Sequence, residues 1–286
     1  MGDNYPARRT KETAHAMTPP RDWTELHWPA IGTPEAARWI AVLPLAATEQ
    51  HGPHLPLGTD VYIAEAYLGC VRALLPAKVP VTFLPVQPLG ISTEHVDYPG
   101  TLTLPTETAL QSWRAIGDSV ARAGIRKLVI VTSHGGNSAA MTLVAQDLRA
   151  AFRMLVVTTS WARFGVPDGL FSADELRHGI HGGAVETSIM LARHPALVRN
   201  EAIGDFASSA ADMESRYRLL STQRPAPMAW QTQDLNASGA VGDATQASAD
   251  KGERVLDHGA RAFCTLLEDV DNFDVNTLAG GPLASP

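Results

Sequence analysis

Four short apolar runs, separated by segments with helical spacing, restrict the folds open to this chain. The most apolar runs are residues 39–45 and 127–132, and two more cover residues 79–86 and 154–159. A run that is apolar at nearly every position is typical of a strand buried on both faces. Helices are expected over residues 60–75, 107–123, 138–151, 183–192 and 251–267. This alternation predicts an α/β fold with a mostly parallel sheet that helices cover on both sides.

The 286 residues, 45% of them hydrophobic, can bury a sizeable core. No internal repeat or linker divides residues 21–275, so we expect one domain there. Residues 1–20 are polar and aperiodic and are interpreted as a flexible N-terminal extension or an arm that packs on a neighbouring subunit. Residues 276–286 are interpreted as a C-terminal tail. Residues 204–250 have weak periodicity, and irregular segments of this length are usually functional or cover a subunit interface.

Charge and cysteine usage exclude several classes of function. The formal net charge is −7 and no basic run exceeds two residues, which argues against nucleic-acid binding. The two cysteines, Cys70 and Cys264, provide neither a disulfide framework nor a thiolate zinc site. The apolar runs are shorter than the ~18 residues of a membrane span, and the N-terminus lacks the apolar stretch of a secretory signal. We therefore expect a cytoplasmic protein that does not bind membranes.

Polar residues gather where the expected strands end, and open parallel sheets bind their ligands at that edge. The first cluster is residues 49–60, directly after the first strand. The second is residues 133–137, directly after the strand over 127–132. The third is residues 181–187, at the start of an expected helix.

These clusters contain a set of side chains that suits metal ions. Glu49 and His51 are two positions apart and share one face of an extended chain. The Gly/Pro-rich loop can bring Asp60 back to them, and its two oxygens make it the natural bridge between two ions. His134 and Glu186 would complete two sites ~3.5–4 Å apart, the spacing that activates a water held between them. A mixed carboxylate and imidazole set favours zinc, manganese or iron over calcium or magnesium.

Each of these residues alone also has a structural interpretation. Asn137 can cap a helix, and Glu186 is a first-turn carboxylate of the kind that a helix dipole favours. A single Glu or His after a strand is more often a loop residue than a ligand. The occurrence of three such clusters in one α/β domain is what favours a metal site.

Four motifs, in this order, resemble the creatininase (creatinine amidohydrolase) family over about residues 37–195. They are Glu-Gln-His-Gly-Pro-His-Leu-Pro at 49–56 with Asp60, Glu-His-Val-Asp-Tyr-Pro-Gly-Thr at 94–101, His-Gly-Gly-Asn at 134–137, and His-Gly-Gly-Ala-Val-Glu-Thr-Ser at 181–188. The resemblance is to the branch with the His-Gly-Gly-Asn motif rather than to creatininase proper.

This resemblance implies a three-layer α/β/α fold, a homohexamer and two divalent ions per subunit, with zinc or manganese ahead of iron. It also implies a hydrolase that acts on a small molecule, with a non-peptide and preferably cyclic amide C–N bond as the target. The family's metal ligands match Glu49, His51, Asp60 and His134. The histidine that passes a proton to the leaving nitrogen matches His181, and a pocket tryptophan matches Trp161.

The chain departs from creatininase itself at three positions. Creatininase has a ligand glutamate where this chain has Gly136, an acidic residue where it has Ile180, and a substrate-covering tryptophan where it has Arg177. We therefore expect Glu186 to supply the missing carboxylate, and a substrate other than creatinine.

Further candidates would support the reaction. The N–H groups of Gly135 and Gly136 would stabilise an oxyanion. His54 and His95 would support the ligands or simply be structural. Arg177 and His178 would recognise a carboxylate or carbonyl of the substrate, although a surface role fits Arg177 equally.

Three other functions stay open. A processing hydrolase of the same family would cleave a peptide end or remove a formyl group. An inactive metal-binding protein would be expected to have lost a ligand or His181, and this chain retains both. A nucleotide-binding module is disfavoured because neither a GxGxxG nor a Walker-type loop is present.

Overall fold

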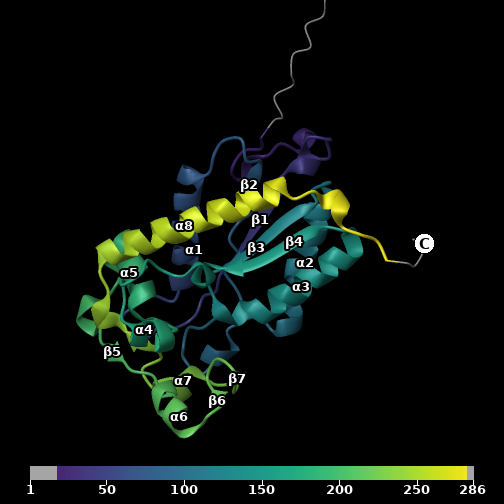
Figure 1. Ribbon diagram of the computed structural model, residues 1–286. Coiled ribbons are helices and arrows are strands. Elements are labelled where there is room, and N and C mark those ends of the chain that lie inside the picture. Colours follow the sequence, from purple (N-terminus) through teal and green to yellow (C-terminus); the bar gives the residue numbers. More distant parts are fainter. Residues whose placement is uncertain (1–17, 282–286) are drawn as a thin grey trace, which may run out of the picture.

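The centre of the molecule is a sheet of four parallel strands in the order β2-β1-β3-β4 (Figure 1). The computed structural model describes residues 18–281. The strands are β1 (Ile40–Leu45), β2 (Val81–Phe83), β3 (Lys127–Thr132) and β4 (Leu155–Ser160). Every residue of β1 and β3 is buried, as expected for strands covered on both faces. The predicted α/β fold with a parallel sheet is confirmed.

Helices form a layer on each side of this sheet (Figure 1). One layer contains α1 (Thr59–Leu74), α5 (Ala184–Arg193) and α8 (Ala249–Asn272), and the other contains α2 (Thr106–Arg122) and α3 (Ser138–Phe152). Alternate residues of β1 pack into the cores beneath the two helix layers. Ile40 and Val42 belong to one hydrophobic core, and Ala41 and Leu43 belong to the other.

Most helix and strand bounds lie within two residues of the expected ones, with two exceptions. The strand expected over residues 79–86 is reduced to β2, because Pro80 and Pro85 flank it and proline has no N–H to donate. Pairing resumes beyond Pro85 at Gln87, whose N–H donates to the Pro44 carbonyl. Helix α8 extends five residues beyond the expected end at residue 267, as far as Asn272.

The expected terminal segments are described only in part, because residues 1–17 and 282–286 lie outside the described residues. Directly after the expected extension, the Arg21 guanidinium donates to the carbonyls of Val79 and Pro76. The expected tail begins within a 3-10 helix, Val275–Thr277.

In the parallel register, strands β1, β3 and β4 end side by side. Leu45 pairs with Thr132, and Thr132 pairs with Ser160. The chain leaving β3 therefore runs beside the chain leaving β1. Asn137 joins the two, because its Nδ2 donates to the Ala46 carbonyl while its Oδ1 accepts the N–H of Ile91. The first two polar clusters are thus held side by side.

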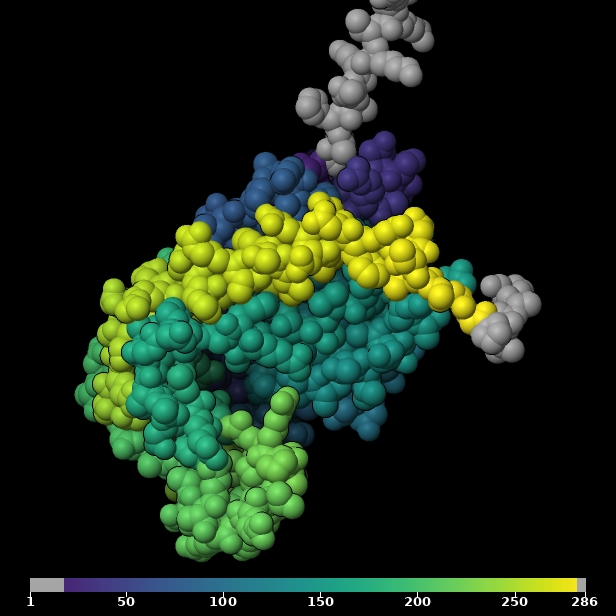
Figure 2. Space-filling view, viewed as in Figure 1, coloured from purple at the N-terminus to yellow at the C-terminus, as the bar shows by residue number. Residues whose placement is uncertain are grey.

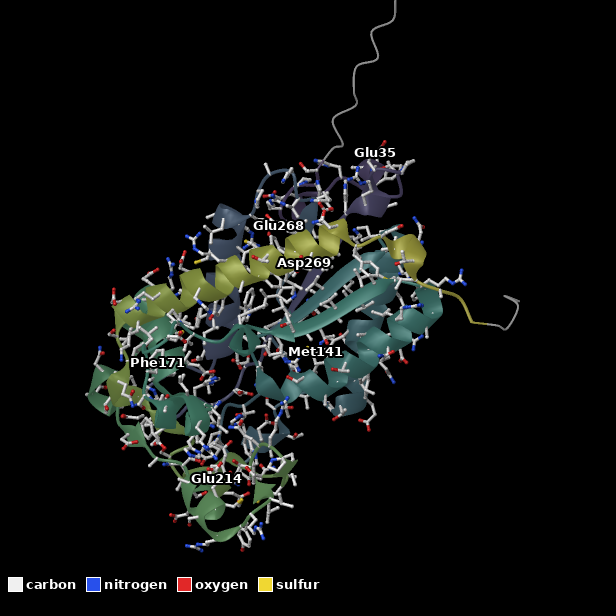
Figure 3. All side chains as sticks on the ribbon, viewed as in Figure 1. Glu35, Met141, Phe171, Glu214, Glu268 and Asp269 are labelled. Carbon is white, nitrogen blue, oxygen red and sulfur yellow. The ribbon has the colours of Figure 1, made fainter. Side chains whose placement is uncertain are left out.

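The irregular stretch over residues 204–250 contains short elements and a lobe that projects from one end of the molecule (Figure 1). Its elements are β5 (Asp205–Phe206), α6 (Ala210–Arg216), β6 (Leu220–Ser221), β7 (Ala226–Pro227), α7 (Thr232–Leu235) and β8 (Gly242–Asp243). The lobe includes α6, where Glu214 is labelled in Figure 3. Within residues 18–281, no helix is both long and apolar enough to cross a membrane.

Candidate metal centre

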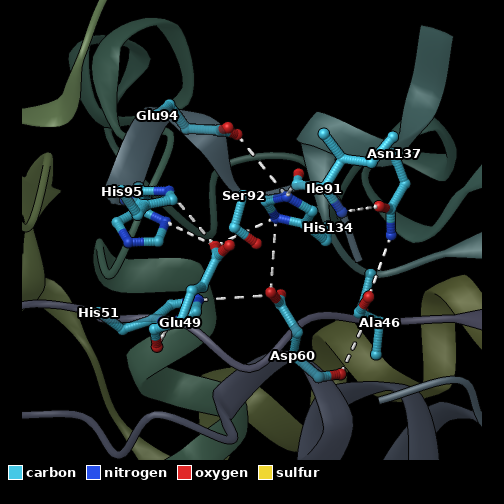
Figure 4. Close-up of polar contacts among 12 residues, drawn as sticks. Ala46, Glu49, His51, Asp60, Ile91, Ser92, Glu94, His95, His134 and Asn137 are labelled. Carbon is cyan, nitrogen blue, oxygen red and sulfur yellow. Dashed lines mark hydrogen bonds and ion pairs between the residues drawn. The ribbon is translucent and has the colours of Figure 1, made fainter. Parts of the chain in front are cut away.

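Glu49, Asp60 and His134 converge beyond the carboxyl ends of β1 and β3 (Figure 4). His134 Nδ1 lies 3.1 Å from Glu49 Oε1 and 3.6 Å from Asp60 Oδ2. Asp60 comes from the first turn of α1, which the loop over residues 49–58 turns back towards β3. The Ser133 hydroxyl fixes that turn by donating to the Asp60 carbonyl over 2.8 Å.

A second group shares Asp60 with the first. His51 Nε2 lies 3.8 Å from Asp60 Oδ1 and 3.9 Å from Glu186 Oε2. Glu186 is in the first turn of α5, and its Oε2 accepts the N–H of Gly182 over 2.6 Å. The two oxygens of Asp60 therefore face two different histidines, as a carboxylate between two cation sites would.

Hydrogen bonds occupy one ring nitrogen of each histidine. The Nδ1 of His51 lies 3.1 Å from the Glu49 carbonyl, so it donates there and Nε2 is the nitrogen left for a cation. The Nε2 of His134 lies 2.7 Å from the Ile91 carbonyl, so it donates there and Nδ1 is the nitrogen left for a cation. Each free nitrogen points at the carboxylates, and second hydrogen bonds of this kind commonly orient metal-binding histidines.

The carboxylates favour positive charge on the histidines beside them. Burial alone would lower the pKa of both histidines, but Asp60 with Glu186 raises that of His51 to about 9, and Glu49 with Asp60 raises that of His134 to about 10. Burial acts to raise the pKa of Glu49, and the facing imidazoles of His134, His181 and His51 outweigh it and lower that pKa. Burial also raises the pKa of Asp60, and that of Glu186 to about 7.

The residues present fit divalent metal ions. Both oxygens of Glu49, both oxygens of Asp60 and His51 Nε2 are buried without a hydrogen-bond partner. Buried polar groups are normally paired, so five such atoms in one cluster suit the ligands of a cation. The ligand atoms lie 3.1 to 3.9 Å apart, as donors at ~2 Å from a shared ion would. Two nitrogens among carboxylate oxygens suit zinc, manganese or iron.

His181 and His95 stack beside the ligands, with ring centroids 4.1 Å apart. His181 Nε2 donates to the Gln50 carbonyl over 2.6 Å, so its unprotonated Nδ1 faces Glu49 Oε1 at 3.8 Å. His95 Nδ1 lies 2.8 Å from the Gln50 amide nitrogen, and its Nε2 lies 3.3 Å from Glu49 Oε1. Burial lowers the pKa of both imidazoles, to about 4 for His95.

Gly135 and Gly136 differ in how much room surrounds them. A Cβ on Gly135 would meet nothing within 4 Å. A Cβ on Gly136 would clash with His134 Nε2 and the Ile91 carbonyl, and would lie 2.6 Å from Glu94 Oε1. Glu94 thus fills the space beside Gly136, which gives a physical reason why no ligand side chain stands at that position.

The remaining candidates lie in different surroundings. His54 Nε2 is 2.9 Å from Thr187 Oγ1 and its ring stacks on Phe206. Arg177, in α4 (Ala173–His178), has a 67% exposed side chain that pairs with Glu214 over 2.8 Å. The structure does not bring Arg177 into the ligand cluster, and His178 Nε2 faces the same Glu214 at 3.8 Å.

Trp161 belongs to a hydrophobic core and not to the ligand cluster. It is 3% exposed and stacks on Tyr67 with ring centroids 4.3 Å apart. Phe263 of α8 packs against it at 4.8 Å. Aromatic side chains thus enclose the indole, and its expected match to a pocket tryptophan stays a prediction.

Replacing Trp161 with Ala should therefore act on stability. We expect the free energy of unfolding to fall by ~3–5 kcal/mol, since a large buried ring is lost. Urea denaturation measures the effect, and Trp28→Ala is the matched control because Trp28 is 83% exposed. A near-neutral Trp161→Ala variant would contradict the core assignment.

Sequence reasoning missed several residues that support the site. Gln50 donates to the Gly239 carbonyl over 2.8 Å and accepts the Gly52 N–H, so it joins the ligand loop to the segment before β8. Thr232 lies 2.7 Å from His95 Nδ1. The one available signal was the position of Gln50 between two ligands, since Thr232 approaches only through the fold.

Two carboxylates around the cluster are partly exposed. Glu186 has a 22% and Glu94 a 17% exposed side chain, whereas Glu49 is fully buried. Figure 2 shows a hollow between the teal part of the chain and the green lobe.

A family model and several known proteins match this chain over most of its length. Residues 24–267 match the family model described as creatinine amidohydrolase. The chain is 35% identical over 234 residues to a mycofactocin precursor peptide peptidase of Mycobacterium tuberculosis, covering 80% of this chain and 81% of the relative. It is 28% identical to a creatinine amidohydrolase of Pseudomonas putida, covering 76% and 84%. A solved creatininase structure superimposes with a TM-score of 0.71 at 25% identity, covering 89% of this chain and 99% of that one.

Proposed function

Because the chain belongs to the creatininase family of hydrolases, we propose that it is a metal-dependent amidohydrolase with a dinuclear centre. The observation that carries the proposal is the set of orphaned buried atoms of Glu49, His51 and Asp60. Two overlapping ligand groups share Asp60, one with Glu49 and His134 and one with His51 and Glu186.

The chemistry divides between the ions and the chain. Two divalent ions held by these residues, with zinc or manganese preferred, would supply an activated water and polarise the amide carbonyl. His181 handles the proton, because its Nε2–H is committed to Gln50 and only Nδ1 faces the cluster. Nδ1 would accept the proton of the attacking water and pass it to the leaving nitrogen. Gly135, beside open space, would direct its N–H towards the developing oxyanion.

Two substrate classes are compatible with this centre. The deep position of Glu49 and Asp60 favours a small amide, for which a cyclic, non-peptide C–N bond is the first candidate. The 35% identity to a precursor peptide peptidase favours a second candidate, the end of a peptide. Gly136, Ile180 and Arg177 depart from creatininase, so creatinine itself is not the expected substrate.

A substrate panel tests the proposal. Metal-free protein is loaded with zinc or manganese and assayed on cyclic ureides, lactams, formamides and short peptides. Turnover of one class that a chelator abolishes, and that the matching ion restores, supports the proposal. Turnover that persists without metal would contradict it.

Glu186→Gln should separate the two ions. An amide is a weaker ligand than a carboxylate, so we expect one ion to bind at least ~10-fold more weakly while the other is retained. Chelator competition measures both affinities. Glu201→Gln is the control, since that side chain is 71% exposed. Unchanged affinity for both ions would place the second carboxylate ligand elsewhere.

Two further properties stay predictions. The cytoplasmic location follows only from the sequence argument, and the homohexamer only from the resemblance. Light scattering on the purified protein tests the assembly.

A further inference from the structure

One buried carboxylate belongs to neither ligand group. Glu175, in the middle of α4, is 3% exposed. Its Oε1 accepts the N–H of Ala184 and its Oε2 accepts the N–H of Asp243, both over 2.6 Å. Burial raises the pKa of this carboxyl, and these two hydrogen bonds oppose the rise. Since both oxygens accept an N–H, the arrangement is that of an ionised carboxylate.

Three glycines make room for this carboxylate. A Cβ on Gly179 or Gly183 would clash with it, and a Cβ on Gly242 would lie 3.0 Å from Oε1. A Cβ on Gly242 would also lie 2.8 Å from the Gly183 Cα and 2.9 Å from the Gly179 Cα. The three backbones therefore meet around one carboxylate, and a side chain at any of the three positions would crowd it.

The segments that Glu175 joins carry the third polar cluster. Ala184 is the first residue of α5, whose first turn bears Glu186. Asp243 is in β8, and the preceding Val241 exchanges two backbone hydrogen bonds with His181. An anion at the start of α5 is also favoured by the helix dipole. Glu175 thus joins residues 181–186 to residues 241–243 through its hydrogen bonds with Ala184 and Asp243.

We propose that Glu175 is a positioning residue that sets the place of Glu186 and His181 at the metal centre. This inference rests on the proposed function for its consequence, but not for its geometry. Glu175 touches neither ligand group and acts through the backbone of residues 181–186.

Glu175→Gln tests the proposal on the full-length protein. The amide can accept only one of the two N–H groups, and its own NH₂ faces the other donor. We expect one ion to bind at least ~10-fold more weakly with the other unchanged, as for Glu186→Gln. The matched control is Asp174→Asn, which removes one charge from the same helix at an 87% exposed side chain. Wild-type affinity for both ions in Glu175→Gln would overturn the proposal.

Amide hydrogen exchange separates this inference from the proposed function. In metal-free protein, Glu175→Gln should speed exchange at His181, Ala184 and Asp243 while β3 stays protected. That result supports the positioning role even if the wild type binds no metal, which would count only against the proposed function. Unchanged exchange at these amides would overturn the positioning role.

A second variant covers the case in which Glu175→Gln does not fold. Gly179 has φ −79°, so alanine is compatible with the backbone there, and the three atoms nearest to its Cβ would all belong to the Glu175 carboxylate. Gly179→Ala should show the same selective loss of one ion and the same local exchange. A Gly179→Ala protein with wild-type values for both would overturn the proposal.

Discussion

Replacing Asp60 with Ala should remove both ions and lower turnover by ~10³-fold or more. The reason is geometric, because Oδ1 faces His51 at 3.8 Å and Oδ2 faces His134 at 3.6 Å. One substitution therefore takes a donor from each ligand group. Metal analysis after gel filtration gives the ion content, and the most active substrate of the panel gives the turnover.

Loss of metal in Asp60→Ala must be separated from loss of fold. Metal-free wild type buries the Asp60 carboxylate without a hydrogen-bond partner, so the metal-free variant should unfold at the same temperature or above it. Asp212→Ala, at an 81% exposed side chain, should keep metal and turnover. An Asp60→Ala protein that retains two ions and full activity would show that Asp60 is not the bridge.

His181→Ala should separate chemistry from metal binding. We expect both ions to remain and turnover to fall by ~10²–10⁴-fold, the usual contribution of a positioned acid or base. Nδ1 of His181 faces the cluster but is not needed to complete either group that contains Asp60. His258→Ala on α8 is the control, since Nε2 of that imidazole lies 3.0 Å from the Phe164 carbonyl and the residue belongs to none of the ligand groups.

The outcome of His181→Ala also decides between two roles. Glu49, His51 and His181 form a third group with ligand geometry. Loss of an ion in the variant would make His181 a ligand rather than the residue that moves the proton. Unchanged turnover would exclude it from both roles.

The sequence predicts the fold and the approach of Glu49, Asp60 and His134 because both follow from local patterns, while their role as ligands stays a prediction. Apolar runs such as Lys127–Thr132 identify the strands, and parallel strands end at a common edge. Side chains that follow two such ends, here Glu49 and His134, then have to lie close together. The position of Glu186 can be predicted by the same reasoning, since it stands in the first turn of a helix that starts at this edge.

The sequence does not predict the contacts made by side chains that arrive from distant segments. Trp161 follows β4 directly, but whether its ring enters a pocket or the core depends on Tyr67 and Phe263. Glu94 fills the space beside Gly136 only because the loop carrying Ile91 is tied to Asn137. Such contacts require the packed chain and leave no periodicity in the sequence.

The contacts of Glu175 are a further case in which distant segments of the chain meet. Its partners stand nine and 68 positions further along the chain, and the three glycines around it are scattered over residues 179–242. Glycines near a histidine suggest a turn, which is a local explanation. Only the structure relates them to one carboxylate.

We propose a two-ion centre built from Glu49, His51, Asp60, His134 and Glu186. The most direct test is the metal-to-chain ratio of the wild-type protein, measured by mass spectrometry of the elements after saturation with manganese or zinc and removal of unbound ions. We predict two ions per chain. A ratio of zero or one would contradict the claim.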